Sequence, residues 1–211
     1  MFFKILLSIV VGYAFGSVMS AIIISKLVYR EDVRKQGSGN SGATNAARVY
    51  GFLTGLFTYL GDFLKGIAAC LLGRLIGGWA LESGVVCMAV AGFAAIIGHS
   101  FPILWRFRGG KGVATGSALA LMLDWRIFVI ALCAFIILVV ITRIVSVGSI
   151  AACVAVAAGS AIFVRNVPAM ILGIAASLVV ILMHWQNIDR LLKGTEKRFV
   201  FGKPKPIPRV K

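Results

Sequence analysis

Seven apolar runs, separated by short polar segments, leave this chain few ways to fold other than in a membrane. The runs cover roughly residues 3–25, 50–73, 79–97, 113–123, 127–142, 146–164 and 168–185. A bilayer core about 30 Å thick is crossed by about 20 apolar residues of helix, and no run alternates with the period of two of a barrel strand. With 60% hydrophobic residues among 211, a soluble domain could not bury this surface. The sequence therefore predicts an all-α, polytopic membrane protein that forms one domain over residues 1–211.

The Lys and Arg residues lie mainly in alternate gaps between these runs. With the N-terminus outside and every run crossing, the cytoplasmic side receives 17 of the 22 cations: five in 26–48, three in 106–111, Arg143 and eight in 190–211. Cytoplasmic loops carry such an excess. We predict seven transmembrane helices in an inner (plasma) membrane, N-terminus out and C-terminus in. The same clustering accounts for the net charge of +15 without a nucleic-acid partner.

The first and fourth runs depart from the ordinary length of a membrane helix. The run 3–25 is long for a secretory signal peptide and cations follow it, so we interpret it as a retained span. The run 113–123 gives about 16 Å of helix, too little to cross alone. We expect it to begin below the membrane surface, in a partly embedded loop that protein encloses or that lines a wet cavity.

The cysteines and histidines show no metal-binding pattern. The four cysteines lie in or beside apolar runs with no CxxC spacing, and they are Cys70, Cys87, Cys133 and Cys153. We expect them to be buried thiols. With only two histidines, the sequence predicts no metal site and no cofactor.

The segment between the first two runs is rich in glycine and small polar residues, reading GSGNSGATNAAR over 37–48. Its glycines match GxGxxG, but flanking apolar runs exclude the βαβ unit which that motif requires. Small residues before a helix leave backbone N–H groups free to hold an anion. Thr44 or Asn45 would cap that helix, and Arg48 would donate to a phosphate. We predict an anion site here; a flexible linker is the alternative.

A second polar segment, residues 98–112, reads GHSFPILWRFRGGKG. The backbone donors of Gly109, Gly110 and Gly112 and the ammonium of Lys111 would converge at the start of the next helix, which predicts a second phosphate site. The Trp and Arg residues before them also fit an anchor to lipid headgroups, which is the alternative. We interpret His99 as structural.

The third segment follows the last run and reads HWQNIDRLLKGTE over 184–196. On a helix, His184 and Asn187 share a face and could both hydrogen-bond a polar substrate. His184 and Asp189 also spell HxxxxD, a signature found in one family of membrane acyltransferases. Because they lie about 140° apart around a helix, we interpret that match as accidental.

Two groups of polar residues lie away from these segments. Asp62 and Lys65 stand one turn apart inside the second run. Ionisable residues inside a membrane are functional candidates, but these two could also simply neutralise each other. Arg143, Ser146 and Ser149 lie around a short turn and could complete a polar rim.

The three segments together, in this order and between these runs, resemble the motifs of the bacterial acyl-phosphate:glycerol-3-phosphate acyltransferases (PlsY). The resemblance runs the length of the chain and implies a seven-helix enzyme with its site at the cytoplasmic face. The implied reaction transfers a fatty acyl group from acyl phosphate to the 1-hydroxyl of sn-glycerol 3-phosphate. It gives 1-acyl-glycerol 3-phosphate (lysophosphatidic acid) and phosphate in phospholipid synthesis. The implied partners are these two substrates, membrane lipid and a soluble phosphate acyltransferase that supplies the donor.

The resemblance also implies roles for individual residues. The catalytic candidates are Ser38, Arg48, Lys111, His184 and Asn187. The substrate-binding candidates are Asn40, Gly109, Gly110, Gly112, Ser149 and Glu196.

An acyl phosphate is already activated, so the protein must mainly hold two anions and align one hydroxyl with one carbonyl. We hypothesise that Lys111 and Arg48 bind the two phosphate groups. Ser38, His184 and Asn187 would position the hydroxyl, and the donor's phosphate would accept its proton. A transporter or flippase for an anionic solute is the main alternative, although we see no internal repeat and few polar residues on the outer side. A membrane scaffold would not need three glycine- and cation-bearing loops on one face.

Overall fold

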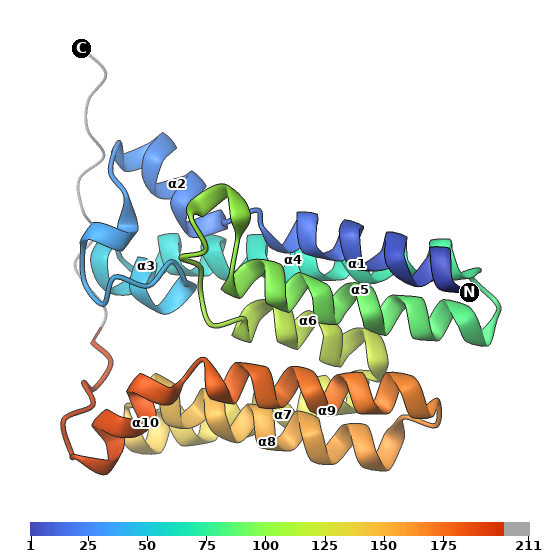
Figure 1. The fold of residues 1–211 in the computed structure, drawn as a ribbon. Coiled ribbons are helices and arrows are strands. Elements are labelled where there is room, and N and C mark those ends of the chain that lie inside the picture. Colours follow the sequence, from blue (N-terminus) through green and yellow to red (C-terminus); the bar gives the residue numbers. More distant parts are fainter. Residues whose placement is uncertain (201–211) are drawn as a thin grey trace.

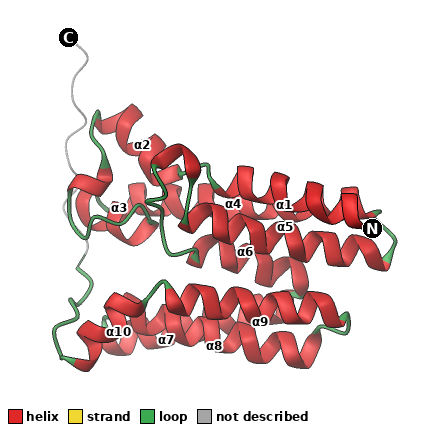
Figure 2. Cartoon of the chain, viewed as in Figure 1, coloured by secondary structure: helices red, strands yellow, loops and turns green. Residues whose placement is uncertain are grey.

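Every regular element in residues 1–200, the part of the chain that this computed structural model describes, is a helix (Figure 2). The α-helices are α1 (Phe2–Gly16), α2 (Ser20–Tyr29), α3 (Ala43–Tyr50), α4 (Phe52–Gly77), α5 (Glu82–Ser100), α6 (Val113–Leu123), α7 (Trp125–Thr142), α8 (Val145–Phe163), α9 (Val167–Leu182) and α10 (Trp185–Leu192). Two short 3₁₀ helices, η1 (Val33–Lys35) and η2 (Ile103–Trp105), lie in the loops. The all-α prediction is confirmed. The last cations counted above, in 201–211, lie outside the described residues.

Several of these helices have the length and apolar composition of membrane spans. Within the described residues, five segments qualify: Phe2–Tyr29, Phe52–Gly77, Glu82–Trp105, Trp125–Thr142 and Val145–Phe163. A sixth is added if α9 and α10, which meet at a 55° bend, count as one span. The short apolar helix α6 corresponds to the predicted run 113–123. The first predicted run is broken at residues 17–19, between α1 and α2.

The long helices pack in two layers (Figure 1). One layer holds α1, α4, α5 and α6, and the other holds α7, α8 and α9. Contacts of α5 and α6 with α9, and of α6 with α7, join the layers. The seam between the layers becomes important below, because the polar groups of the site come from both sides of it.

Small residues allow helices within a layer to approach closely. Gly12 and Gly16 of α1 face Ala91 and Ala95 of α5, and a Cβ added to either glycine would lie 2.2 or 2.1 Å from an α5 carbonyl oxygen. Close backbone approach through small residues spaced four apart is typical of helix pairs in membranes, because the hydrophobic effect does not drive helices together within lipid.

The two ends of the bundle differ in composition. At one end, Lys4 Nζ donates to the Gly77 carbonyl (3.1 Å) and Asn166 Nδ2 donates to Glu82 Oε2 (2.6 Å). We call this the far end. The opposite end carries α2, α3, α10 and the loops around η1 and η2, and we call it the loop end (Figure 1). All three polar segments singled out from the sequence therefore meet at one end of the molecule.

The helix α6 starts inside the bundle: its first residues lie below the level at which the neighbouring helices α5 and α9 end. A Cβ on Gly112, its N-cap, would lie 3.0 Å from Ile96 Cγ2 and 3.4 Å from Val180 Cγ2. Ile96 lies four residues before the end of α5, and Val180 lies two residues before the end of α9. The loop before α6 thus enters the bundle, as the short length of the run predicted.

The cysteines follow the prediction with one exception. Cys70, Cys87 and Cys153 are buried free thiols, whereas Cys133 is exposed on α7. The prediction of burial is wrong for Cys133, because α7 fully buries only Ile127 and Ala131, and Cys133 lies on an exposed part of its surface.

Candidate functional site

A continuous chain of polar contacts joins the second and third segments at the loop end. Lys111 Nζ donates to Asn187 Oδ1 (2.6 Å), and Asn187 Nδ2 donates to Glu196 Oε1 (2.5 Å). Ser146 Oγ also donates to Glu196 Oε1 (2.8 Å), while Arg190 Nε donates to Glu196 Oε2 (2.6 Å). One carboxylate therefore orients an amide, a hydroxyl and a guanidinium, and the amide in turn holds the lysine ammonium. We call these five residues the Lys111 network.

Positive charge exceeds negative charge around this network. Burial lowers the pKa of Lys111 from its ordinary 10.5 to about 8; Glu196 opposes this effect, while Arg190 and Arg48 add to it. Burial also acts to raise the pKa of Glu196, but hydrogen bonds from Arg190, Asn187 and Ser146 outweigh it and the pKa falls below its usual value. At neutral pH Lys111 thus has one carboxylate, Glu196, and two further cations, Arg190 and Arg48, close enough to act on it, and this surplus of positive charge favours a bound anion.

The helix α3 brings Arg48 toward the Lys111 network. Arg48 lies in the last turn of α3, half-buried, and close enough to lower the pKa of Lys111. The predicted capping of this helix by Thr44 or Asn45 is wrong, because the N-cap is Gly42 and no side chain caps it. The side chain of Asn45 is instead used inside the preceding loop.

Asn45 organises the first polar loop. Its Oδ1 accepts from the Ser38 N–H (2.8 Å), and its Nδ2 faces the carbonyls of Val33 (3.2 Å), Gln36 (3.1 Å) and Asn40 (2.9 Å). A buried amide that closes a loop in this way fixes the backbone, which argues against the flexible linker. Ser38 itself is exposed, and its backbone N–H is held by this contact.

The Gly109–Gly112 segment is folded against His99 at the end of α5. The Gly110 N–H donates to the His99 carbonyl (3.0 Å), and a Cβ on Gly110 would lie 2.1 Å from His99 Nε2. Gly112 has φ +85°, which glycine adopts without strain. Because the Gly110 amide is already paired, the expectation that every glycine amide here reaches a phosphate is wrong. The segment's main contribution is to place Lys111.

His184 lies at the bend between α9 and α10, where it serves as the N-cap residue of α10. Its Nδ1 lies 2.8 Å from the Val180 carbonyl, so Nδ1 carries a proton and the neutral ring keeps its lone pair on Nε2. Asp189 instead pairs with Lys193 (2.9 Å) on the exposed side of α10. The two residues form no relay, which supports the interpretation of HxxxxD as accidental.

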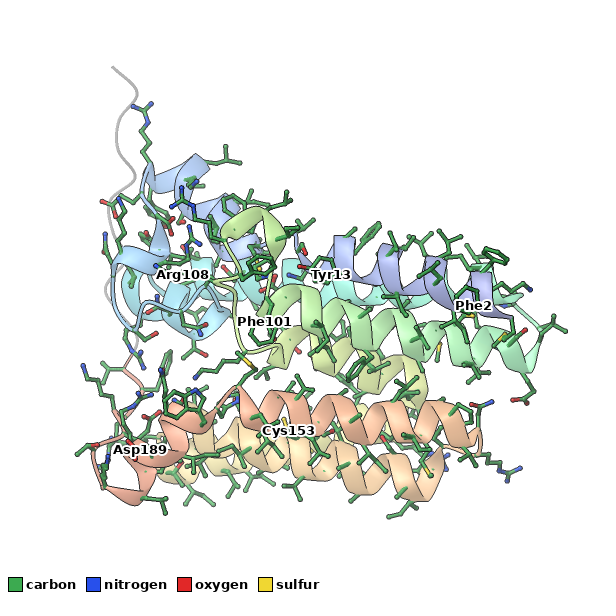
Figure 3. The ribbon with its side chains drawn as sticks, in the orientation of Figure 1. Phe2, Tyr13, Phe101, Arg108, Cys153 and Asp189 are labelled. Atoms are coloured by element: carbon green, nitrogen blue, oxygen red, sulfur yellow. The ribbon has the colours of Figure 1, made fainter. Side chains whose placement is uncertain are left out.

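The structure brings some of the predicted residues together and leaves others apart. Lys111, Asn187 and Glu196 lie in one network, and Arg48 acts on it electrostatically. Ser149 is buried but donates to the Val145 carbonyl in its own helix (3.0 Å). In Figure 3, Arg108 of the second loop and Asp189 of α10 lie at the loop end, opposite Phe2.

Two residues of the site were not singled out from the sequence as candidates. Arg190 joins the Lys111 network, and its position three residues after Asn187 on the same helix was an available signal. Asn45 was expected only to cap the helix. Its actual partners are carbonyls of the preceding loop, and helix spacing does not predict those contacts. Ser146, noted only as part of a possible rim, reaches Glu196 directly.

Comparison with known proteins gives the family. Residues 6–194 match the model of the glycerol-3-phosphate acyltransferase family. The glycerol-3-phosphate acyltransferase of Finegoldia magna is 38% identical over 190 residues, which are 90% of this chain and 93% of that protein. A glycerol-3-phosphate acyltransferase of Coxiella burnetii is 38% identical over 196 residues, 92% of this chain and 97% of its own length.

Two solved structures share the fold. Both are crystal structures of PlsY, an integral membrane glycerol 3-phosphate acyltransferase, in a glycerol 3-phosphate form and a lysophosphatidic acid form. Each superposes with a TM-score of 0.83, at 30% and 29% identity, over 93% of this chain and 96% and 95% of PlsY. With its apolar helices and these relatives, the chain belongs to the glycerol-3-phosphate acyltransferase family of integral membrane enzymes, of the PlsY kind.

Proposed function

We propose that this protein transfers a fatty acyl group from acyl phosphate to the 1-hydroxyl of sn-glycerol 3-phosphate. The products are lysophosphatidic acid and phosphate, and a soluble phosphate acyltransferase would supply the donor. The observation that carries the proposal is the surplus of cations around the half-buried Glu196: Arg190 pairs with it, Lys111 interacts with it, and Arg48 acts electrostatically on Lys111. Both substrates carry a phosphate, and a site for two anions needs this surplus.

The cations would hold the substrates and stabilise the charge that develops between them. Lys111 and Arg48 would bind the two phosphate groups, and their positive charge would favour the leaving phosphate. Lys111 is restrained by Asn187, which is itself held by Glu196, so its ammonium is placed before substrate arrives. Such preorganisation avoids rearrangement during the reaction.

The attacking hydroxyl needs an acceptor or an orienting group. His184 Nε2 keeps a lone pair because Nδ1 is engaged by the Val180 carbonyl, so it can accept a hydrogen bond from the hydroxyl. Asn187 and Ser38 would complete its positioning. The phosphate of the donor would take the proton as it leaves, so that the acyl carbonyl carbon gains the glycerol oxygen and loses the phosphate oxygen.

The activity is tested with purified protein and palmitoyl phosphate. Phosphate release and lysophosphatidic acid formation should both require glycerol 3-phosphate, and palmitoyl-CoA or palmitoyl acyl carrier protein should not replace the donor. Lys111→Ala should lose roughly 10²–10³-fold in rate, as expected when one preorganised cation is removed. Lys193→Ala, an exposed lysine at the C-cap of α10 that pairs with Asp189, is the matched control and should keep full activity. Equal use of palmitoyl-CoA, or full activity in Lys111→Ala, would contradict the proposal.

We also propose that the loop end faces the cytoplasm, that the chain crosses the membrane seven times, and that the N-terminus is outside. The cluster of cations at the loop end supports this orientation. In a cysteine-free background, Arg108→Cys and Asp189→Cys should react with an impermeant thiol reagent in inside-out vesicles. Arg165→Cys, between α8 and α9, should react in right-side-out vesicles. Labelling of Arg108→Cys and Asp189→Cys from opposite sides would exclude a shared site.

A further inference from the structure

A buried ionic cluster lies beside the Lys111 network but is separate from it. Lys65 Nζ lies 2.8 Å from Asp62 Oδ1, 2.9 Å from His99 Nδ1 and 2.5 Å from the Val18 carbonyl. The side chains of Lys65, Asp62 and His99 are only 6%, 1% and 3% exposed. We call these three residues the Asp62 cluster. The mechanism proposed above uses none of them.

Each proton of the Lys65 ammonium has an acceptor in this arrangement. With Nδ1 of His99 accepting from Lys65, the neutral imidazole carries its proton on Nε2. The Asp62 carboxylate also accepts from Ser20 Oγ (2.9 Å) at the start of α2. The cluster therefore ties the break between α1 and α2 to α4 and to the end of α5.

The same cluster supports the segment that carries Lys111. His99 provides the carbonyl that pairs with the Gly110 N–H, and its ring occupies the space that a side chain at residue 110 would fill. On the other side, Thr115 Oγ1 of α6 lies 3.3 Å from the Asp62 carbonyl. His99 thus holds the residues on the N-terminal side of Lys111, and α6 holds those on its C-terminal side. His99 is a member of the Asp62 cluster, and α6 contacts the cluster through the Asp62 carbonyl.

A purely stabilising role does not account for these residues. Ion pairs buried in apolar surroundings contribute little net stability compared with well-packed apolar side chains, because both charges lose their water. A displacement of about 1 Å in a catalytic group, by contrast, lowers rates by roughly 10²-fold. Fixing the direction of His99, and through it Lys111, is a function that apolar packing would not supply.

We propose that Asp62, Lys65 and His99 are positioning residues for Lys111. The proposal rests on the assigned role of Lys111 in the proposed function. Lys65 sets the orientation of His99, and His99 sets the path of Gly110, so that the Lys111 ammonium meets Asn187. No member of the Asp62 cluster touches substrate.

The first test replaces both charges together, because removal of one alone would leave a buried unpaired charge. In an Asp62→Leu/Lys65→Met variant, kcat/KM for glycerol 3-phosphate should fall roughly 10²-fold. The Gly110 amide should exchange hydrogen for deuterium faster, while the unfolding temperature stays near that of wild type. Lys4→Met removes a lysine-to-carbonyl contact at the far end and should change neither rate nor exchange. Wild-type rate and exchange in a folded double variant would overturn the proposal.

A second pair of variants decides the question if the double variant does not fold. His99→Asn keeps an acceptor near the position of Nδ1, whereas His99→Leu has none and leaves the Asp62–Lys65 pair in place. His99→Asn should be at least about tenfold more active than His99→Leu and should exchange more slowly at Gly110. Equal values in the two variants would refute the positioning role. The exchange measurement needs no substrate, so absence of acyl-phosphate turnover in wild type would defeat the proposed function without deciding this inference.

Discussion

The lowered pKa of Lys111 gives the sharpest prediction, because Lys111 should lose its positive charge within the pH range in which enzyme activity is ordinarily assayed. The pKa is about 8, lowered first by burial and then by Arg190 and Arg48. Below pH 8 the ammonium is mostly charged and can hold a phosphate. As pH rises through 8 the proton is lost, so kcat/KM for glycerol 3-phosphate should fall on the alkaline side.

The expected size follows from that pKa. A group with a pKa near 8 is about 90% charged at pH 7 and about 10% charged at pH 9, so kcat/KM should drop roughly tenfold between these values. Phosphate monoesters lose their second proton near pH 6, below this window, so the substrate's own charge changes little across it. The pH dependence of kcat/KM reports the free enzyme, where no bound phosphate yet favours the charged lysine.

The assay is the initial rate of phosphate release at low glycerol 3-phosphate, from pH 6.5 to 9.5, at constant ionic strength. Arg190→Gln removes a cation that lowers the pKa of Lys111 and should move the alkaline limb to higher pH. Arg106→Gln, an exposed arginine of the second loop, is the matched control and should leave the limb in place. A flat profile between pH 7 and 9 in wild type, or the same displacement in both variants, would refute the reasoning.

Three further predictions concern packing and the carboxylate. Gly110→Ala places a Cβ against His99 Nε2 and should lower kcat/KM at least about tenfold without a matching loss of unfolding temperature. Gly16→Ala should lower the free energy of unfolding by about 1–3 kcal/mol in detergent, because the new methyl group meets an α5 carbonyl. Gly116→Ala should not, because its Cβ would make only ordinary van der Waals contacts, 3.8 Å from Ile96 and Val180. Glu196→Gln removes the carboxylate that orients the network and should lower kcat in the phosphate-release assay, and full activity would show that its charge is dispensable.

The sequence predicted the polar segments well because each combines features that rarely occur together. A glycine-rich loop that carries a cation between two apolar runs can be recognised as a candidate anion site from the sequence alone. The depth of α6 followed from length alone, since eleven apolar residues do not cross a bilayer. The arrangement of cations in alternate gaps also predicted that Lys111 and Asn187 meet at one end.

What sequence reasoning missed depends on contacts between distant segments. The role of His99 is visible only when Gly110 is seen against it, and Lys65 reaches His99 across 34 residues. Asn45 was assigned to a helix cap because capping is a local rule, whereas its partners are carbonyls of a loop whose path the sequence does not reveal. Local rules predicted the elements, and tertiary packing decided which side chains the elements present.

The seam between the two layers runs through the middle of the site. Lys111 and Arg48 belong to the layer of α4 and α6, while Arg190 belongs to the layer of α8 and α9. Lys111 already meets Asn187 of α10 across this seam (2.6 Å), and a phosphate held by Lys111 and Arg48 on one side and Arg190 on the other would add a second bridge between the layers. On the proposed function, substrate should therefore also raise the resistance of the two layers to separation, because a ligand that binds only the folded protein stabilises it.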